Sequence, residues 1–489
     1  MIGNLQQKTP LFDAMVSLAE SRNVSFHTPG HKSGKGISTR FRKFVGPRIF
    51  TIDLTTLDEV DSLQKPRGVI KQAHELAAQA YGADASFFLT NGTSGGNHAM
   101  MLTACPPDRE VLVARNAHKS ILAGLILSGG RPIFFSPDVN PGLKLSMNVS
   151  FAGVKAAIDA NPQAKTLILT SPNYFGVAAD LETIVSYAHQ RGVVVLVDEA
   201  HGPHLHFHSK LPASAMAAGA DLSVQSTHKI IGGMTQASML HAQGERIDKV
   251  FLSSALRQTQ STSPSYILMA SLDLARMQMA TEGEKLLDKA IGLAESARAR
   301  INKIPGFFCF DKNAFGKPPE GNTCDLDVTK LTLSVEGLGL SGFEVLRILN
   351  EQYRIQVEMA DPAHVLVIVS IGDRQEDLDG LIDALQEISK HHFGQNPPAD
   401  FQDLQPPSFG EATKMTPRAA FFHRKEHLPL EKAEGAVCAD IVTVYPPGIP
   451  VLIPGEVITQ GVVSYLIQMI ALGGLIDGLE QDRTIEVVS

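Results

Sequence analysis

Short apolar runs alternate with amphipathic stretches along the chain from about residue 70 onward. The runs are rich in β-branched side chains and apolar on both faces: 86–90, 110–114, 131–136, 166–170, 193–197 and 221–225. Several stretches between them, such as 69–81 and 97–104, repeat their apolar positions with helical periodicity. Strands that are buried on both faces and connected by helices are typical of a sheet sandwiched between helices. The pattern therefore predicts an α/β fold with a mainly parallel sheet.

The pattern changes after the last of these runs. Residues 266–303 predict one long helix, rich in Ala, Leu, Met and charged side chains. The following stretch contains strand-like and helix-like runs that predict an α+β unit: 330–335, 341–352, 365–370 and 374–390. A Pro-rich, polar and aperiodic stretch then predicts a linker. We expect five parts: an N-terminal segment (1–50), a major domain (51–290), a small α+β domain (291–393), the linker (394–410) and a C-terminal α+β domain (411–489).

The composition excludes several classes of protein. The 489-residue chain is 44% hydrophobic and 19% charged, so it can bury a large core and is not disordered. Its net charge of -8 gives no basic excess for binding nucleic acid or an anionic membrane. The most apolar stretch near the end, 462–475, is too short and too interrupted to span a bilayer. Four widely spaced cysteines and the absence of a signal-peptide pattern favour a cytoplasmic location.

An acidic residue ends one of the buried strands. The run 193–197 is followed by Asp198, Glu199, Ala200 and His201. Parallel α/β sheets bind ligands at the carboxyl ends of their strands, so Asp198 would stand at that edge. A helix cap or a metal ligand is the alternative. The position at the end of the strand favours a functional role.

A lysine follows the next buried run. Residues 221–225 lead into Ser226, Thr227, His228 and Lys229. A lysine close to a buried strand is costly unless it is paired or has reacted. A partly desolvated lysine with a lowered pKa is the usual nucleophile for imine formation with a carbonyl. A surface lysine on a loop is the alternative, which the flanking hydroxyls and glycines weaken because together they suit a phosphate.

A third element lies between a strand and a helix. Residues 90–96 contain three glycines and three hydroxyl side chains, and a helical pattern follows them. Hydroxyls and the free N–H groups at the start of a helix can bind an anion. The stretch matches neither the dinucleotide-binding nor the Walker pattern, and alone it is as consistent with an ordinary helix cap. Pyridoxal phosphate needs a lysine for its aldehyde, a carboxylate for its ring nitrogen and a phosphate site. The three elements together fit this cofactor.

Six stretches spread over most of the chain resemble those of one enzyme family: FHTPGHK (26–32), TNGTS (90–94), NAHKS (116–120), SPNYFG (171–176), STHK (226–229) and YPPG (445–448). The chain is identified by them as a member of the ornithine/lysine/arginine decarboxylase family, which consists of fold type I pyridoxal-phosphate enzymes. It is most similar to the short bacterial branch, and we expect no N-terminal wing domain. The resemblance implies a homodimer or larger homo-oligomer with active sites at the dimer interface.

The resemblance also implies a role for each matching residue. Lys229 would bind the cofactor as an imine, and Asp198 would keep the ring nitrogen protonated. His118 would stack on one face of the ring and Ala200 would pack on the other. The other cofactor contacts would come from Thr93, Ser94, Gly95, His201, Ser226 and His228. The candidate catalytic residues are Lys229, Asp198, His118 and His228, and a hydroxyl within 260–263 would reach the partner's phosphate.

The substrate is less clearly indicated by the sequence. A cationic side chain needs acidic partners, and we name Asp58 and Glu456 as candidates, with Asp61 behind them. Surface exposure is the alternative for each acid. The short branch of the family implies arginine and a place in polyamine biosynthesis, with lysine close behind. Arginine, lysine and ornithine cannot be separated by spacing alone.

A fold type I aminotransferase or lyase is the alternative function, because it would use Asp198 and Lys229 equally well. Arg347 and Arg354 could bind a substrate α-carboxylate in an aminotransferase. The residues around Lys229 and the extra C-terminal unit favour decarboxylation.

Three alternating histidines, His204, His206 and His208, would share one face of an extended segment, but without a Glu-containing zinc motif we expect no metal.

Overall fold

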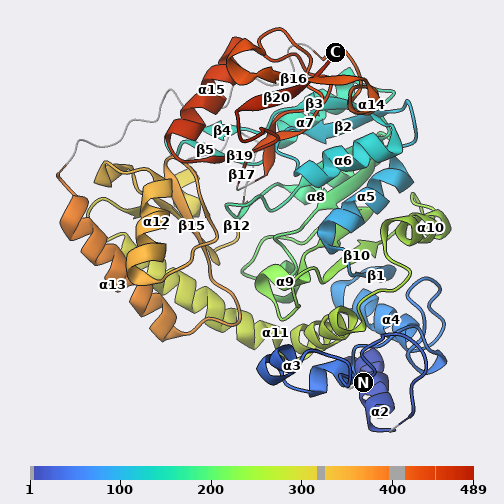
Figure 1. Ribbon diagram of the computed structural model, residues 1–489. Helices are drawn as coiled ribbons and strands as arrows, with labels where there is room; N and C mark the ends of the chain where they lie inside the picture. Colours follow the sequence, from blue (N-terminus) through green and yellow to red (C-terminus); the bar gives the residue numbers. More distant parts are fainter. Residues whose placement is uncertain (1–4, 22, 316–324, 396–412, 446–447) are drawn as a thin grey trace.

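The computed structural model describes residues 5–21, 23–315, 325–395, 413–445 and 448–489 (Figure 1). A seven-stranded sheet with helices on both faces forms its centre, and a four-stranded sheet lies at the far end of the long helix α11 (Tyr266–Ile301). The C-terminal unit lies against the major domain at the opposite side from helix α2 (Pro10–Glu20).

The central sheet has the strand order β1-β10-β9-β8-β6-β2-β3. Its strands are β1 (Ala85–Leu89), β2 (Glu110–Ala114), β3 (Arg131–Phe135), β6 (Thr166–Thr170), β8 (Val194–Asp198), β9 (Leu222–Gln225) and β10 (Ser238–Ala242). The strands from β9 to β3 are parallel, whereas β10 is antiparallel to both of its neighbours. The carboxyl ends of β6, β8 and β9 therefore meet at one edge of the sheet.

Helices cover both faces of this sheet because its strands are apolar on both sides. Val113 packs into the cluster under α5 (Gly92–Ala104), α6 (Lys119–Ser128) and α10 (Lys249–Thr259). Its neighbour Leu112 points to the other face, under α7 (Phe151–Ala160) and α8 (Leu181–Gln190). The other elements of the major domain and the N-terminal segment are α3 (Thr39–Val45), η1 (Arg48–Thr51), η2 (Asp58–Val60), α4 (Val69–Tyr81), β4 (Val139–Asn140), β5 (Leu145–Ser146), β7 (Val177–Ala178), η3 (Leu205–Phe207) and α9 (Thr227–Ile230).

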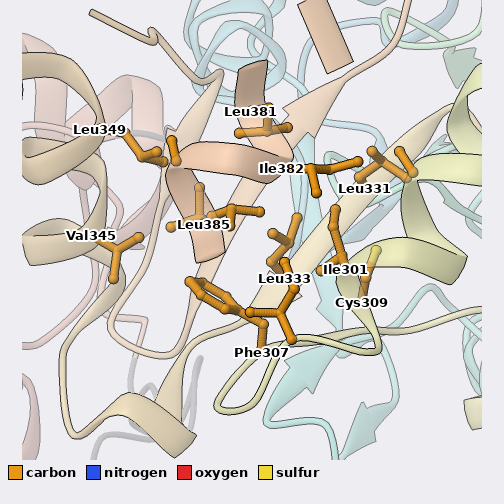
Figure 2. Packing of buried hydrophobic residues seen from close by; sticks show 14 of the residues in the cluster. Ile301, Phe307, Cys309, Leu331, Leu333, Val345, Leu349, Leu381, Ile382 and Leu385 are labelled. Carbon is orange, nitrogen blue, oxygen red and sulfur yellow. The ribbon is translucent and has the colours of Figure 1, made fainter. Parts of the chain in front are cut away.

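The small domain packs two helices and the end of α11 onto a sheet of order β11-β13-β15-β14. Figure 2 shows its core, in which Leu333 of the sheet lies among Ile301 of α11, Val345 and Leu385. Its elements are β11 (Phe308–Cys309), η4 (Lys312–Phe315), β13 (Lys330–Ser334), η5 (Glu336–Leu338), α12 (Gly342–Tyr353), β14 (Met359–Ala360), β15 (His364–Ile368) and α13 (Gln375–His392). Strand β12 (Asp325–Leu326) pairs with β7 and so joins this domain to the major one.

The C-terminal unit has its own apolar core, formed around Leu466 and Val444. Its elements are α14 (Pro417–Phe422), β16 (Lys425–Pro429), η6 (Leu430–Lys432), β17 (Val442–Tyr445), β18 (Ile449–Leu452), α15 (Gln460–Ala471), β19 (Leu475–Asp477) and β20 (Thr484–Val488). β16 pairs with β20, and β17 lies between β18 and β19. Helix α14 packs against α6 of the major domain.

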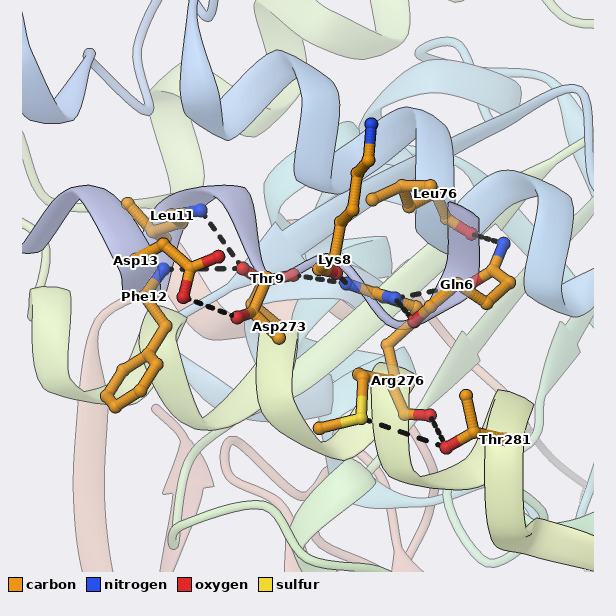
Figure 3. A network of polar contacts seen from close by, with 11 residues as sticks. Gln6, Lys8, Thr9, Leu11, Phe12, Asp13, Leu76, Asp273, Arg276 and Thr281 are labelled. Carbon is orange, nitrogen blue, oxygen red and sulfur yellow. Dashed lines mark hydrogen bonds and ion pairs between the residues drawn. The ribbon is translucent and has the colours of Figure 1, made fainter. Parts of the chain in front are cut away.

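A buried polar network attaches the N-terminal segment to α11 (Figure 3). Asp273 and Arg276 form an ion pair of 2.6 Å, and both side chains are fully buried. The carboxylate accepts from the backbone N–H of Leu11 at 3.0 Å, at the start of α2 where N–H groups lack helical partners. The guanidinium donates to the carbonyl oxygens of Gln6 and Lys8, each at 2.6 Å. The buried ion pair thus fastens the residues from Gln6 to Leu11 to helix α11.

The predicted α/β fold with a mainly parallel sheet is confirmed. Helix α4 spans the predicted residues 69–81, and the predicted strands match β1, β2, β3, β6, β8 and β9 to within a residue or so at each end. Strand β10 was not predicted. Most of the predicted linker lies outside the described residues. Within the described ranges, no helix is both long enough and apolar enough to cross a bilayer.

Candidate active site

The carboxyl ends of β6, β8 and β9 and the start of α5 enclose a cavity of about 540 Å³. Ligands bind at this edge of parallel α/β sheets. Polar and ionisable side chains predominate in its lining: Asn91, Thr93, Ser94, Asn97, His118, Ser120, Thr170, Tyr174, Asp198, His201, Ser226, His228, Lys229, Thr235, Gln236 and Glu358. Gly92, Ala200 and Met359 complete it.

Lys229 enters this cavity from the short helix α9, directly after β9. Burial lowers the pKa of its ammonium group, although Asp198 and Glu358 act in the opposite direction. Its Nζ lies 2.8 Å from Nε2 of His201. A larger fraction of Lys229 is therefore the neutral amine, the form that attacks a carbonyl.

Asp198, the last residue of β8, is 2% exposed and is held from two sides. Asn97 of α5 donates to Oδ2 at 2.9 Å, and the backbone N–H of Ala200 donates to Oδ1 at 3.2 Å. The same amide of Asn97 donates to Ser120 Oγ at 2.8 Å. That hydroxyl lies 2.8 Å from Nδ1 of His118. One amide thus orients both the carboxylate and, through Ser120, the imidazole.

His118 caps the start of α6 and is a neutral imidazole. Its Nδ1 accepts from the backbone N–H of Ser120 at 3.2 Å, which leaves the ring proton on Nε2. Burial lowers the pKa of His118 and Lys229 lowers it further, whereas Asp198 raises it. The net direction is downward, so the ring is uncharged at neutral pH.

Hydroxyl groups gather where α5 begins. Thr93 Oγ1 hydrogen bonds to Ser226 Oγ and lies 3.2 Å from Ser238 Oγ. The first N–H groups of a helix lack intrahelical partners and, with the helix dipole, favour an anion. His228 at the other side uses Nδ1–H to donate to the carbonyl of Ala237 at 3.0 Å, and burial lowers its pKa. The arrangement suits a phosphate group.

Comparison with known proteins decides the family. The model for the Orn/Lys/Arg decarboxylase major domain matches residues 9–377, and the model for the C-terminal domain of the same family matches residues 407–484. The chain belongs to the Orn/Lys/Arg decarboxylase family. The predicted enzyme class, an amino acid decarboxylase, is thereby confirmed, and membership implies pyridoxal phosphate as cofactor.

The chain is similar to both arginine and lysine decarboxylases of this family. The arginine decarboxylase of Bacillus subtilis (strain 168) is 41% identical over 483 residues, which cover 99% of this chain and 98% of the relative. The constitutive lysine decarboxylase of Escherichia coli (strain K12) is 25% identical over 570 residues, covering 97% and 79%. The crystal structure of the Francisella novicida lysine decarboxylase LdcF shares the fold with a TM-score of 0.86, at 24% identity, covering 98% of this chain and 81% of that one.

The structure brings most of the predicted cofactor residues of the decarboxylase to one cavity. Lys229, Asp198, His118, Ala200, His201, Thr93, Ser94, Ser226 and His228 all line it. Gly95 lies one residue outside the lining, where an added Cβ would come within 3.2 Å of Asn91 Cβ. What each residue does in the reaction stays a prediction.

The two predicted substrate acids lie elsewhere. Asp58 is exposed in η2 and does not line the cavity. Glu456 is 6% exposed and forms an ion pair of 3.2 Å with Arg115 in the contact between the C-terminal unit and the major domain. The carboxylate that does line the cavity beside Asp198 is Glu358, just before β14. Sequence reasoning missed it because an acid in a polar stretch carries no sign of where it points.

The three alternating histidines have different partners. His204 is fully buried with Nε2 3.1 Å from Asp327 Oδ2, and His208 pairs with Asp288 at 3.0 Å. His206 contacts different residues: its Nδ1 lies 3.3 Å from Ser214 Oγ, and its ring centroid lies 5.6 Å from that of Phe207. The segment turns through η3 instead of running extended, so the three rings do not share a face.

Proposed function

We propose that this protein is a pyridoxal-phosphate-dependent arginine decarboxylase that converts arginine to agmatine and CO2, a step that suits polyamine biosynthesis. Relatives named arginine decarboxylase from Halalkalibacterium halodurans, Bacillus anthracis and Bacillus cereus are 41% to 42% identical to this chain, like the B. subtilis one. Relatives named lysine decarboxylase are 25% to 27% identical. This difference in identity over nearly the whole chain is the observation that favours arginine.

The chemistry of the cavity lining suits the cofactor. It has an amine with a lowered pKa, a buried carboxylate and a group of hydroxyls at a helix start. Two buried polar atoms in its lining, Asn97 Oδ1 and Thr170 Oγ1, have no hydrogen-bond partner among the described residues. Buried polar atoms are normally satisfied, so these two are expected to find partners in a bound ligand or its waters.

Each lining residue then has a specific task. Lys229 would hold the aldehyde carbon, Asp198 the ring nitrogen, and Thr93 and Ser226 the phosphate. His118 would lie against one face of the ring. When bound, the cofactor supplies an electron sink for the electron pair that the departing carboxylate leaves behind.

The side chains of the protein would stabilise charge and supply protons while the carboxylate leaves. The carboxylate of Asp198 is oriented by Asn97, so it would keep the ring nitrogen protonated, and the ring able to accept electrons, without reorganising. Lys229 would deliver the proton that replaces the carboxylate on the product carbon. His118 is neutral and keeps Nε2–H directed away from Ser120, available as a donor.

Glu358 would recognise the cation of the substrate. It lines the same cavity as Lys229 and its charge raises the pKa of that lysine, so the two groups lie within electrostatic range. A carboxylate accepts two parallel hydrogen bonds from a guanidinium, which is the terminal group of arginine. We assign substrate binding to Glu358, in place of Glu456 and Asp58.

A homodimer or larger homo-oligomer would complete the site. Residues 261–263 are exposed beside the start of α11, where their hydroxyls would be within reach of a second copy. Gln260, in contrast, accepts from the backbone N–H of Thr90 at 3.0 Å within its own chain. The partner's contact would therefore come from the serine and threonine residues that follow it.

The test is product formation from arginine, lysine and ornithine, each supplied separately to the purified protein with pyridoxal phosphate. Agmatine and CO2 from arginine, with little product from the other two, is the expected result. Cadaverine or putrescine as the main product would overturn the choice of arginine within the family. A keto acid without CO2 would overturn decarboxylation itself and favour the aminotransferase alternative.

A further inference from the structure

Three basic side chains form a continuous line from the cavity into the small domain. Nζ of Lys229 lies 2.8 Å from Nε2 of His201, and Nδ1 of the same imidazole lies 3.1 Å from Nζ of Lys330. His201 is 2% exposed and Lys330, the first residue of β13, is 1% exposed. A lysine is almost never fully buried without a partner, so its presence behind the cavity requires an explanation.

The hydrogen-bonding capacity of the imidazole restricts the protons on this line. Burial lowers the pKa of His201 well below its usual value, and Lys229 and Lys330 lower it further, so the ring is neutral. A neutral imidazole has one N–H and one lone pair. It can therefore accept from one lysine only while it donates to the other. One of the two lysines must be an uncharged amine.

The surrounding charges indicate which lysine carries the proton. Burial lowers the pKa of Lys330 to about 8, and Asp327 opposes this decrease. Burial alone would raise the pKa of Asp327, but His204, Lys330 and Thr329 lower it to about 2, so its carboxylate is charged. The favoured arrangement has the Lys330 ammonium donating to Nδ1 and Nε2–H donating to the amine of Lys229.

The other titratable groups near the line leave this assignment in place. Asp198 and Glu358 face Lys229 from the cavity, and His118 lies on the same side. His204 faces His201 from behind, next to Asp327. The aromatic ring of Tyr174 covers the line: its centroid lies 4.8 Å from that of His201 and 5.7 Å from Nζ of Lys229.

We propose that Lys330 is a proton reservoir for Lys229 and that His201 connects them; this rests on the decarboxylation proposed above. Replacing a carboxylate with hydrogen consumes one proton in each turnover. The ammonium of Lys330 gives a proton to Nδ1 of His201, and the proton on Nε2 passes to Nζ of Lys229, which delivers it to the carbon that has lost CO2. A proton that later reaches Nε2 from cavity water returns the Nδ1 proton to Lys330 and restores the starting state.

The reservoir removes a difficulty that a closed site creates. Substrate and cofactor together displace water from the cavity, so bulk water cannot recharge Lys229 during the reaction. A proton stored behind Lys229 is available without any opening of the site. An acid whose pKa lies near neutrality both holds and releases its proton readily. Burial brings the pKa of Lys330 to about 8, far closer to neutrality than that of an ordinary lysine.

The backbone around Lys330 is built to hold the side chain in this position. Arg298 donates to the carbonyl of Lys330 at 3.0 Å and to that of Val328 at 2.9 Å. Gly176 of the major domain has a φ of 85°, and an added Cβ there would lie 2.8 Å from Lys330 Cγ. Lys330 comes from the small domain and the other two residues from the major domain. The line is therefore complete only when the domains are docked.

The first experiment measures the titration of Lys229 in the cofactor-free protein by pH-dependent competitive labelling of its amine. In Lys330→Met, His201 is free to place its proton on Nδ1 and accept from a Lys229 ammonium. We expect the neutral-amine fraction of Lys229 at fixed pH to fall roughly tenfold, the equivalent of a one-unit rise in its pKa. Lys144→Met, which removes a lysine paired with Glu336 away from the line, is the control and should change nothing.

The second experiment uses the enzyme loaded with cofactor. Lys330→Met should lower kcat on the order of 10²-fold, as loss of general acid catalysis does, with KM nearly unchanged and partial rescue by added methylamine. In a His201→Phe background, Lys330→Met should have little further effect because the connection is already broken. Lys330→Gln replaces Lys330→Met if that variant does not fold.

The two experiments separate this proposal from the proposed function. A folded Lys330 variant that leaves both the Lys229 titration and kcat as in the wild type would overturn the reservoir. Equal effects of Lys330→Met with and without His201 would overturn the route through the imidazole. A changed Lys229 titration in a protein that decarboxylates no basic amino acid would uphold the link between the two lysines and overturn the function.

Discussion

Arg115 and Glu456, 341 positions apart in the sequence, form a buried ion pair with Nη2 3.2 Å from Oε2. The carboxylate also accepts from the backbone N–H of Ile453 at 2.9 Å. The guanidinium donates to the carbonyls of Pro450 and Val451. Three residues after Arg115 the chain reaches His118 in the cavity. The C-terminal unit therefore holds the segment that carries a residue of the site.

Removal of one partner of this pair should destabilise the protein. Glu456→Leu removes the carboxylate that pairs with the buried Arg115 guanidinium, and breaking a buried pair in this way costs about 3–5 kcal/mol. Chemical denaturation followed by circular dichroism should show this loss. Asp477→Asn, which removes the exposed pair with Lys119, is the control and should cost about 1 kcal/mol or less. An equal effect of the two substitutions would contradict the account.

Asp198→Asn should lower turnover far more than it lowers cofactor content. The amide keeps the size of the side chain and part of its hydrogen bonding but carries no charge, and electrostatic stabilisation of this kind contributes on the order of 10²–10³-fold to kcat. Bound pyridoxal phosphate is measured by absorbance and kcat by amine production. Equal turnover in mutant and wild type would exclude the role of Asp198 at the ring nitrogen.

Glu358→Gln should weaken binding of the substrate cation. A hydrogen bond to a charged group contributes about 1.5–3 kcal/mol, so KM for arginine should rise about 10- to 100-fold. kcat should change much less, because a contact with the terminal cation is made equally in the bound substrate and in the transition state. Asp58→Asn, at an exposed acid outside the cavity, is the matched control and should leave KM unaltered. The reverse result would return the substrate role to Asp58.

Stability should fall as the pH decreases from 7 to 5, partly because of His74. Its Nε2 accepts from the backbone N–H of Phe88 at 3.1 Å, and burial lowers its pKa to about 4. The unfolded chain binds a proton near pH 6.5, so between pH 6.5 and 4 the unfolded state binds more protons and stability is lost as pH falls. A pKa difference of this size corresponds to about 2 kcal/mol between pH 7 and 5.

The His74 contribution is measured by comparing unfolding of wild type and His74→Gln at both pH values. Glutamine can accept the same hydrogen bond but does not titrate. The variant should therefore lose less stability than the wild type on acidification. An identical pH dependence for the two proteins would show that His74 does not contribute.

The sequence predicts those parts of the fold that depend on local pattern. Helix α4 repeats its apolar positions every third or fourth residue, and β6 has three consecutive apolar residues between two threonines, so both are recognisable. Asp198 and Lys229 could be placed in one site because both follow buried strands, whose ends meet in a parallel sheet. Strand β10 was missed because it contains Ser238 and His241, which are buried only through pairing with its neighbours.

The remaining site residues depend on contacts far apart in the sequence. Lys330 precedes an apolar run, where a lysine is ordinarily solvated, and only docking of the small domain buries it. Glu456 could not be distinguished from a substrate-binding acid because its partner Arg115 lies in another domain. Asn97 sits in a helix whose sequence gives no indication that its amide orients Asp198.

The most direct test of the account is turnover of carboxyl-labelled [1-¹³C]arginine in D2O by the wild-type protein and by Lys229→Ala, both supplied with pyridoxal phosphate. We predict that the wild type releases ¹³CO2 and agmatine in equal amounts, and that the agmatine carries one carbon-bound deuteron from solvent. The Lys229→Ala variant should form neither product at a comparable rate. Undiminished ¹³CO2 release without Lys229, or conversion of arginine to a keto acid that retains the label, would contradict a decarboxylase site at the ends of β8 and β9.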